Sequence, residues 1–255
     1  MKKLTLVFAH PDDESLAVGG TAAKYVRRGW QVDLICATRG ELGAEDPKDR
    51  GEELAKIREQ ELTKATETLG ISSVTCLDYK DGKLKSLHYG EMEDKVYKLF
   101  DSLRPDVVIT FDPSGMTNHP DHKKVSEATT FAFQKYAKER FSENPDDANP
   151  PKLYFTCLPQ SLVAYLQKTR VIPSQRFGAP WKGISDDFIT TVIDIKRQKA
   201  LKVKAIMEHK SQQGPLKKLF ILQNSPLLFY EHFLLRMVGT LEAFMGKNDR
   251  VSDRL

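Results

Sequence analysis

Residues 4–14 read Leu4-Thr5-Leu6-Val7-Phe8-Ala9-His10-Pro11-Asp12-Asp13-Glu14. Apolar and β-branched residues fill the first half of this stretch, and their short run predicts a buried strand over 4–9. Pro11 has no amide hydrogen for a sheet ladder, so the strand should end near Ala9. The second half contains one imidazole and three carboxylates. Such a cluster repels itself unless it faces solvent or a cation neutralises it, and we expect it to hold a metal ion.

The composition is that of an ordinary globular protein: of 255 residues, 40% are hydrophobic and 29% are charged. We expect a single domain over residues 1–255, with a core at about 4–212 and a helical C-terminal extension over 213–255. No apolar run approaches the ~18 residues that span a membrane, and the first apolar run is too short for a signal peptide. The net charge of +4 is scattered among acidic residues, which disfavours nucleic-acid binding.

The chain contains three cysteines, which are Cys36, Cys76 and Cys157. They are far apart, odd in number and each in or beside an apolar run, so we expect buried free thiols. No CxxC pair is present, which disfavours a thiolate metal site. Free thiols indicate a reducing compartment, and we therefore expect a cytoplasmic protein.

Strands and helices are predicted to alternate along the chain. Short apolar runs predict strands at 4–9, 31–38, 74–77, 106–111, 153–158 and 188–193. Amphipathic patterns with end signals predict helices at about 19–28, 50–69, 91–103, 120–140 and 195–212. The remaining segments are expected to be loops at 39–49, 112–119, 141–151 and 173–187, followed by a partly helical tail at 226–245.

This alternation predicts an α/β fold, a Rossmann-like three-layer sandwich with a mostly parallel central sheet. The right-handed crossover rule places the first and fourth strands side by side, with the active site at their C-terminal ends. A dinucleotide site would need a GxGxxG loop after the first strand. The loop found there, His10 to Glu14, carries carboxylates that would repel a pyrophosphate. Gly19-Gly20 alone is weak evidence for a nucleotide, since a close helix–strand contact explains it.

A second polar cluster, Asn118-His119-Pro120-Asp121-His122, follows the predicted fourth strand. If the first and fourth strands are neighbours, the two clusters meet in one crevice. His10, Asp13 and His122 would then give two imidazoles and one carboxylate, with positions left open for water and substrate, as in catalytic zinc sites. The same ligands suit iron(II), and another divalent metal remains open. A lone histidine is usually structural, but two such clusters at the ends of two strands are hard to explain in that way.

Five segments together resemble the LmbE-like/PIG-L family of zinc-dependent N-deacetylases. They are Ala9 to Glu14, His119-Pro120-Asp121-His122, Thr38-Arg39-Gly40-Glu41, Arg58-Glu59 and His209-Lys210-Ser211-Gln212. The resemblance covers about residues 4–212, and the first two motifs at their spacing are its most specific part. The family's Rossmann-like fold agrees with the predicted order of strands.

The resemblance implies a set of zinc ligands, which are His10, Asp13 and His122. It implies that Asp12 is the general base toward the attacking water and later the acid toward the departing amine. His119 would stabilise the oxyanion and would be oriented by Asp121. The two neighbouring aspartates would therefore differ in role, with one fixed on the metal and the other free to exchange a proton.

The resemblance also implies a substrate-binding role for Arg58, which would contact the acyl group or the product carboxylate. An Arg58–Glu61 surface pair is the alternative. Asp81 would hydrogen-bond a sugar hydroxyl, although an Asp-Gly pair is equally a turn signal. His209 would act near the site or would simply stabilise the C-terminal end of a helix. Some sugar-deacetylating members carry a tyrosine where this chain has Thr117, so another oxyanion donor is needed here.

We expect a metal-dependent hydrolase that removes an acetyl group from a small N-acetylglucosamine-type substrate. The alternatives are an amidase on a related sugar or thiol conjugate, an iron(II) oxygenase with the same ligands, and a non-catalytic metal- or sugar-binding module. The long loop 173–187, which carries Arg176, Phe177 and Trp181, either covers the pocket or is an ordinary surface loop. Family members are often trimers or hexamers, so the resemblance implies a homo-oligomer.

Overall fold

The structure is a computed structural model that describes residues 1–44, 46–212, 225–243 and 251–255. Five strands run parallel: β1 (Lys3–Phe8), β2 (Gln31–Thr38), β3 (Ser73–Tyr79), β4 (Val107–Phe111) and β5 (Lys152–Cys157). Three strands add antiparallel pairing: β8 (Thr191–Asp194), β9 (Tyr230–Val238) and β10 (Leu241–Glu242). The order across the described sheet is β10-β9-β5-β4-β1-β2-β3, and β8 also pairs with β9.

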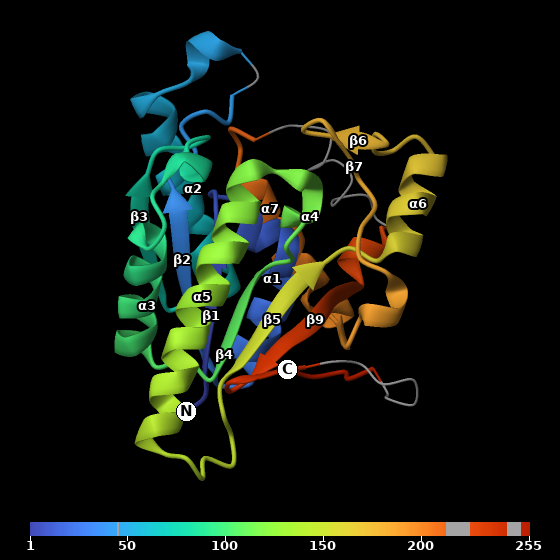
Figure 1. The fold of residues 1–255 in the computed structure, drawn as a ribbon. Helices are drawn as coiled ribbons and strands as arrows, with labels where there is room; N and C mark the ends of the chain where they lie inside the picture. Colours follow the sequence, from blue (N-terminus) through green and yellow to red (C-terminus); the bar gives the residue numbers. More distant parts are fainter. Residues whose placement is uncertain (45, 213–224, 244–250) are drawn as a thin grey trace.

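Helices cover both faces of this sheet, as Figure 1 shows. One layer consists of α1 (Asp13–Arg27), α2 (Glu52–Leu69) and α7 (Lys199–Glu208). The other layer consists of α3 (Glu91–Leu103) and α5 (Pro120–Glu143). Two short helices and a hairpin lie beyond the carboxyl ends of the parallel strands: α4 (Gly115–Asn118), α6 (Gln160–Lys168), and β6 (Gln175–Arg176) with β7 (Ala179–Pro180). This arrangement confirms the predicted three-layer α/β fold.

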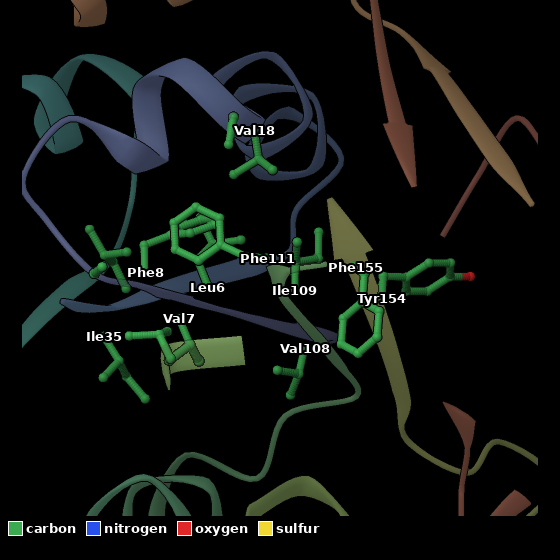
Figure 2. Close-up of a cluster of buried hydrophobic side chains, with 14 of the residues drawn as sticks. Leu6, Val7, Phe8, Val18, Ile35, Val108, Ile109, Phe111, Tyr154 and Phe155 are labelled. Carbon is green, nitrogen blue, oxygen red and sulfur yellow. The ribbon is translucent and has the colours of Figure 1, made fainter. Parts of the chain in front are cut away.

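The sequence of β1 is apolar without alternation because both of its faces are buried. Figure 2 shows Leu6 and Phe8 on the face that packs toward α1, and Val7 on the opposite face. The ring of Phe8 meets that of Phe111 edge to face at 4.9 Å, which joins β1 to β4. The two strands pair in parallel with Leu6 beside Ile109. The predicted adjacency of the first and fourth strands is therefore confirmed.

The first helix begins at Asp13, six residues before the predicted start at Gly19. Asp13 and Glu14 lie in its first turn, where carboxylates stabilise the positive end of the helix dipole. Gly20 lies inside α1, and a side chain at this position would clash because its Cβ would come within 2.5 Å of Ile195. Gly20 therefore serves close packing of α1 against the residue that follows β8, whereas Gly19 has ordinary clearance. Close packing is the explanation that the sequence favoured over a nucleotide site.

The predicted helical extension over 213–255 is wrong for 230–238, which form strand β9. Its Leu- and Phe-rich sequence pairs antiparallel with β5 on one side and β8 on the other, so tertiary pairing overrides the apolar pattern. Residues 213–224 and 244–250 lie outside the described residues. The sequence pattern also does not predict α4 or α6, which are too short to show a clear period.

Strand β9 contributes a buried carboxylate to the helix layer. The two oxygens of Glu231 accept hydrogen bonds from the amides of Gly20 and Thr21, at 2.9 and 2.7 Å. Lys202 of α7 donates a further hydrogen bond to Glu231 at 2.6 Å, and both side chains are almost fully buried. Strand β9 therefore links α1 and α7 through a buried side chain in the core.

All three cysteines are free thiols. Cys36 and Cys157 are buried as expected, but Cys76 is exposed, so the expectation is wrong for this residue. Cys76 lies on β3, the edge strand of the sheet, which leaves its side chain open to solvent. Across the described ranges, no helix combines the length and the apolar character that a membrane crossing requires.

Candidate metal centre and active site

Three predicted ligands meet at the carboxyl ends of β1 and β4. His10 follows β1, and His122 lies in the first turn of α5, which follows β4. Nδ1 of His10 lies 3.2 Å from Nε2 of His122. Asp13 completes the group, with one carboxylate oxygen 3.3 Å from Nε2 of His122 and the other 3.5 Å from Nδ1 of His10. All three side chains are buried.

The spacing of these atoms fits a small cation. Nitrogen and oxygen ligands at tetrahedral zinc lie at about 2.0–2.1 Å from the metal, which puts neighbouring ligand atoms roughly 3.3 Å apart. The two separations from Nε2 of His122 are 3.2 Å to His10 and 3.3 Å to one Asp13 oxygen, and the other Asp13 oxygen lies 3.5 Å from Nδ1 of His10. The far ring nitrogens are engaged elsewhere, since Nδ1 of His122 lies 3.1 Å from the Gly115 carbonyl and Nε2 of His10 lies 3.1 Å from Asp81. Such contacts fix the ring orientation and direct the other nitrogen to a metal.

Two further groups also bring potential ligand atoms within 4.8 Å of one another: His10–His119–His122 and His10–Asp81–Asp121. The carboxylate of Asp121 already accepts hydrogen bonds from the amides of Gly82 and Leu84, at 2.7 and 3.2 Å. Asp81 likewise accepts a hydrogen bond from the amide of Leu42 at 3.0 Å. We therefore favour His10, Asp13 and His122 as the cation site. The carboxylates of Asp81 and Asp121 then lie beside Nε2 of His10, the ring nitrogen that faces away from this site.

The charge states of the three residues suit a cation. Burial lowers the pKa of His10, but hydrogen bonds with Asp121 and other carboxylates outweigh it and raise the pKa well above its usual value. The same carboxylates would favour a metal cation in place of that proton. Burial lowers the pKa of His122 to about 3, so its imidazole is neutral. Burial opposes ionisation of Asp13, but His122 and His10 hold the pKa of that carboxyl well below its usual range.

Asp12 is positioned differently from its neighbour. Its φ of 114° is in the left-handed region, which is strained for a residue other than glycine. Its side chain lines the pocket and is 21% exposed, with one oxygen 3.4 Å from the Arg58 guanidinium. Burial, opposed by the charge of Arg58 and reinforced by that of Asp13, raises the pKa of Asp12 to a net value of about 6. A pocket-facing carboxyl that titrates near neutrality can accept and return a proton.

Arg58 is buried beneath this loop, with a side chain that is 3% exposed. Its guanidinium donates hydrogen bonds to the carbonyls of Pro11 and Gly40. An added Cβ at Gly43 would lie 2.0 Å from the guanidinium, so a larger residue there would force Arg58 to shift. The alternative surface pair with Glu61 is wrong, because Glu61 accepts hydrogen bonds from the segment after α7 instead. A contact between Arg58 and an acyl group remains a prediction.

His119 faces the pocket from the N-terminal cap of α5. Its Nδ1 accepts a hydrogen bond from the backbone amide of Asp121 at 3.2 Å, which assigns the ring hydrogen to Nε2. Burial, followed by the charge of His10, lowers the pKa of His119 to about 4, so the imidazole is neutral. Asp121 thus orients His119 through its amide, whereas its carboxylate lies 3.4 Å from Nε2 of His10.

Two other predicted residues also line the pocket, namely Asp81 and Thr117. Burial raises the pKa of Asp81, but His10 lowers it to a net value of about 2, so this carboxylate is ionised. One of its oxygens faces His10, and the other accepts a hydrogen bond from the amide of Leu42. A contact between Asp81 and a sugar hydroxyl therefore remains a prediction.

His209 does not line the pocket but contacts Glu14, two residues after Asp12. It is 1% exposed, and its Nε2 lies 2.9 Å from a carboxylate oxygen of Glu14. Glu14 also accepts hydrogen bonds from the Ser15 hydroxyl and the Asp12 amide. No sequence pattern could pair His209 with Glu14, since 195 residues separate them.

The pocket has a volume of about 390 Å³ and is lined by two kinds of side chain. The first kind is the carboxylates and imidazoles described above. The second kind is apolar and includes Leu16, Met116, Leu158, Leu166, Ile172 and Leu227. The loop 173–187 contributes Arg176, Phe177 and Trp181 to the lining of the pocket. Of the two expectations for this loop, the structure therefore favours the one that places it at the pocket. The indole of Trp181 donates a hydrogen bond to the Met116 carbonyl at 2.8 Å, which fixes this segment to α4.

Residues 5–133 match the protein family described as PIG-L, GlcNAc-PI de-N-acetylase. A 1D-myo-inositol 2-acetamido-2-deoxy-alpha-D-glucopyranoside deacetylase of Mycolicibacterium vanbaalenii is 32% identical over 256 residues, covering 89% of this chain and 87% of that protein. A Bacillus anthracis protein named "Probable N-acetyl-alpha-D-glucosaminyl L-malate deacetylase 2" is 38% identical over 135 residues, which are 52% of this chain and 59% of that protein.

A similar solved structure is the N,N'-diacetylchitobiose deacetylase of Pyrococcus horikoshii, with a TM-score of 0.65 and 24% identity. The alignment covers 93% of this chain and 84% of that one, and at this identity it supports the fold alone. The family match spans β1 to α5 and thus includes both histidine clusters. Together with the alignment to the Mycolicibacterium enzyme over most of both chains, this match shows that the protein belongs to the PIG-L family of de-N-acetylases.

Proposed function

We propose that this protein is a zinc-dependent N-deacetylase that hydrolyses the acetamido group of an α-linked N-acetylglucosamine conjugate. The observation that carries the proposal is the placement of Asp12, an ionisable carboxyl, beside a buried group of two imidazoles and a carboxylate. The two relatives support the substrate class, since both names contain an N-acetylated α-D-glucosaminyl unit joined to a different group.

His10, Asp13 and His122 would hold the metal, which when bound would acidify a water molecule and polarise the amide carbonyl. Asp12 would take a proton from the attacking water on its pocket-facing oxygen and pass it to the departing amine nitrogen. The bond that breaks is the amide C–N bond, and the products are acetate and a free amine. The Nε2–H group of His119 would donate a hydrogen bond to the carbonyl oxygen as negative charge develops there.

The surroundings of Asp12 also support catalysis over a purely metal-binding role. Its backbone is in a strained conformation, and Arg58 contacts its carboxylate from a buried position. Strain of this kind persists where the surrounding structure enforces it, often at functional sites. A binding module would have no use for a proton-exchanging carboxyl at this point.

The test is acetate release from methyl α-N-acetylglucosaminide and the inositol and malate conjugates. The purified protein is stripped of metal and then reloaded separately with zinc, iron(II) or manganese. We expect stoichiometric acetate and amine, with zinc restoring activity. Asp12→Asn should lower kcat by roughly 10²–10⁴-fold while metal content stays unchanged, and the surface variant Asp101→Asn should behave as wild type. Full activity in Asp12→Asn would refute the mechanism, and no acetate from any conjugate would refute the function.

A further inference from the structure

Two arginines line the pocket, and they differ in their partners. Arg58 contacts Asp12 and two backbone carbonyls. The guanidinium of Arg176, by contrast, forms no ion pair or hydrogen bond with any residue in the described part of the chain. Arg176 is half-buried, and burial lowers its pKa without an offsetting carboxylate. Among the described residues, this guanidinium therefore has no anion of the kind that buried charges normally have.

The position of Arg176 is fixed by its neighbours. It lies on β6, and its guanidinium carbon is 5.3 Å from the ring centre of Phe177 and 5.7 Å from that of Trp181. Trp181 is anchored to the Met116 carbonyl, and Asn118 donates hydrogen bonds to the carbonyls of residues 179 and 180. These contacts restrict the position of the Arg176 side chain before a ligand binds. Less side-chain conformational entropy is therefore lost on binding.

The cation lies apart from the carboxylates of the metal centre. Phe177 contacts both regions, since its ring centre lies 5.3 Å from the guanidinium carbon of Arg176 and its ring meets that of His119 edge to face at 4.6 Å. An amide at the metal centre would thus have the sugar and its attached group extending toward Arg176. Apolar lining residues near the hairpin, which include Leu166 and Ile172, exclude water and strengthen any charge pair formed there.

We propose that Arg176 binds an oxyanion, either a carboxylate or a phosphate, on the group to which the N-acetylglucosamine is attached. The planar guanidinium can accept such a group through two parallel hydrogen bonds. The inference rests on the proposed deacetylase function and adds the chemical class of the attached group. The same arrangement orients the substrate, because the carboxylates around the metal centre repel the anion while the guanidinium of Arg176 attracts it.

The experiment uses matched α-N-acetylglucosaminides that differ only at one position of the attached ring: phenyl, 4-carboxyphenyl and 4-phosphonophenyl. Acetate release is measured for wild type, Arg176→Gln and Lys182→Gln. Lys182 is exposed and one residue past Trp181, so its variant removes the same charge outside the pocket lining. The ratio of kcat/KM for an anionic glycoside to that for the neutral one is the readout.

We expect wild type to prefer at least one anionic glycoside by roughly tenfold to a hundredfold, through KM. Arg176→Gln should bring this ratio close to one, and Lys182→Gln should keep it. The larger of the two anionic ratios identifies the carboxylate or the phosphate. A wild-type ratio near one, or an equal loss on all three glycosides in Arg176→Gln, would overturn the proposal.

Two measurements keep the inference separate from folding and from the proposed function. The wild-type preference should fall as salt rises, because ions screen the charge pair, and this needs no variant. Calorimetric binding of the three glycosides tests the anion site even if no acetate is released. Failure of acetate release on every glycoside would refute the deacetylase function, whereas release without an anionic preference would refute only the role of Arg176.

Discussion

Nδ1 of His10 lies 3.2 Å from Nε2 of His122, although 112 residues separate the two histidines in sequence. The parallel pairing of β1 with β4 produces this contact, since each histidine closely follows its strand. The proposed metal centre therefore exists only in the folded sheet. Metal binding and folding should be thermodynamically linked as a result.

Removal of the metal should destabilise the protein. A ligand at about 100 times its Kd stabilises the native state by roughly 2.7 kcal/mol, so a chelator should lower the Tm by about 5–10 °C. His122→Ala should contain little zinc by elemental analysis and should show no Tm change with chelator. His88→Ala, at an exposed histidine outside the site, is the control and should respond like wild type. Wild-type zinc content in His122→Ala would contradict the proposed ligand set.

Gly43→Ala should disturb the active site through Arg58. The new Cβ would lie 2.0 Å from a guanidinium nitrogen, and Arg58 cannot move without losing its hydrogen bonds to the Pro11 and Gly40 carbonyls. We expect kcat/KM for acetate release to fall by roughly 10²-fold, because Asp12 loses its position.

The matched control for this substitution is Gly19→Ala, inside α1. A Cβ at Gly19 meets its neighbours at 3.5 Å or more, which is ordinary contact. Its activity should be unchanged and its stability should rise by up to about 1 kcal/mol through helix propensity. Equal activity in both glycine variants would show that Arg58 does not position Asp12.

Stability should depend on pH through His209. Burial lowers the pKa of this imidazole and Arg58 opposes its charge, but Glu14 and Asp12 raise the pKa above 6.5 overall. The folded state therefore binds a proton more tightly than the unfolded state. The resulting stabilisation is complete below about pH 6.5 and is lost as the pH rises through the folded pKa.

Urea unfolding of wild type and His209→Gln between pH 6 and pH 9 checks this expectation. His209→Gln leaves Glu14 buried without its cation, so it should lose about 3–5 kcal/mol at pH 6 and lose less at high pH. The difference in unfolding free energy between the two proteins should shrink as pH rises. A difference that stays constant with pH would mean that His209 does not carry the charge.

The native protein should present one reactive thiol. Cys76 is exposed, whereas Cys36 and Cys157 are buried. Partial burial of the thiol raises the pKa of Cys76. Because the thiolate is the reactive form, reaction with a disulfide reagent should accelerate as pH increases. We expect one thiol to react in the folded protein, three in denaturant and none in folded Cys76→Ser. Reaction of more than one thiol in the native state would contradict the packing of the sheet.

The parts of the fold that sequence could predict are those with strong local signals. The strand before His10 is a short run of apolar and β-branched residues, and the strand before Asp112 is another. Parallel topology brings the polar residues that follow them to one edge, so the amino-acid sequence alone is enough to group His10, Asp13 and His122. The helix start at Asp13 is less predictable, because Gly19-Gly20 gives a stronger break signal than an acidic first turn.

The remaining features depend on contacts that no local pattern encodes. The apolar residues of β9 carry no clear period, and only pairing with β5 makes them a strand. The ion pair of Glu14 with His209 and the hydrogen bond from Trp181 to the Met116 carbonyl join distant segments through tertiary packing. Propensity and spacing describe neither kind of contact. The sequence could therefore single out these residues but could not predict which residues they contact.

The carboxylate of Glu231 ties the end of the chain to the helix that begins with Asp13. Without β9, the amides of Gly20 and Thr21 would lose their acceptors, and the ammonium of Lys202 would lose its ion pair inside the core. Loss of one partner of a buried ion pair is worth about 3–5 kcal/mol, a large share of the stability of a typical domain. A protein truncated after residue 212 would therefore lose these core partners, and it should not retain a working catalytic half.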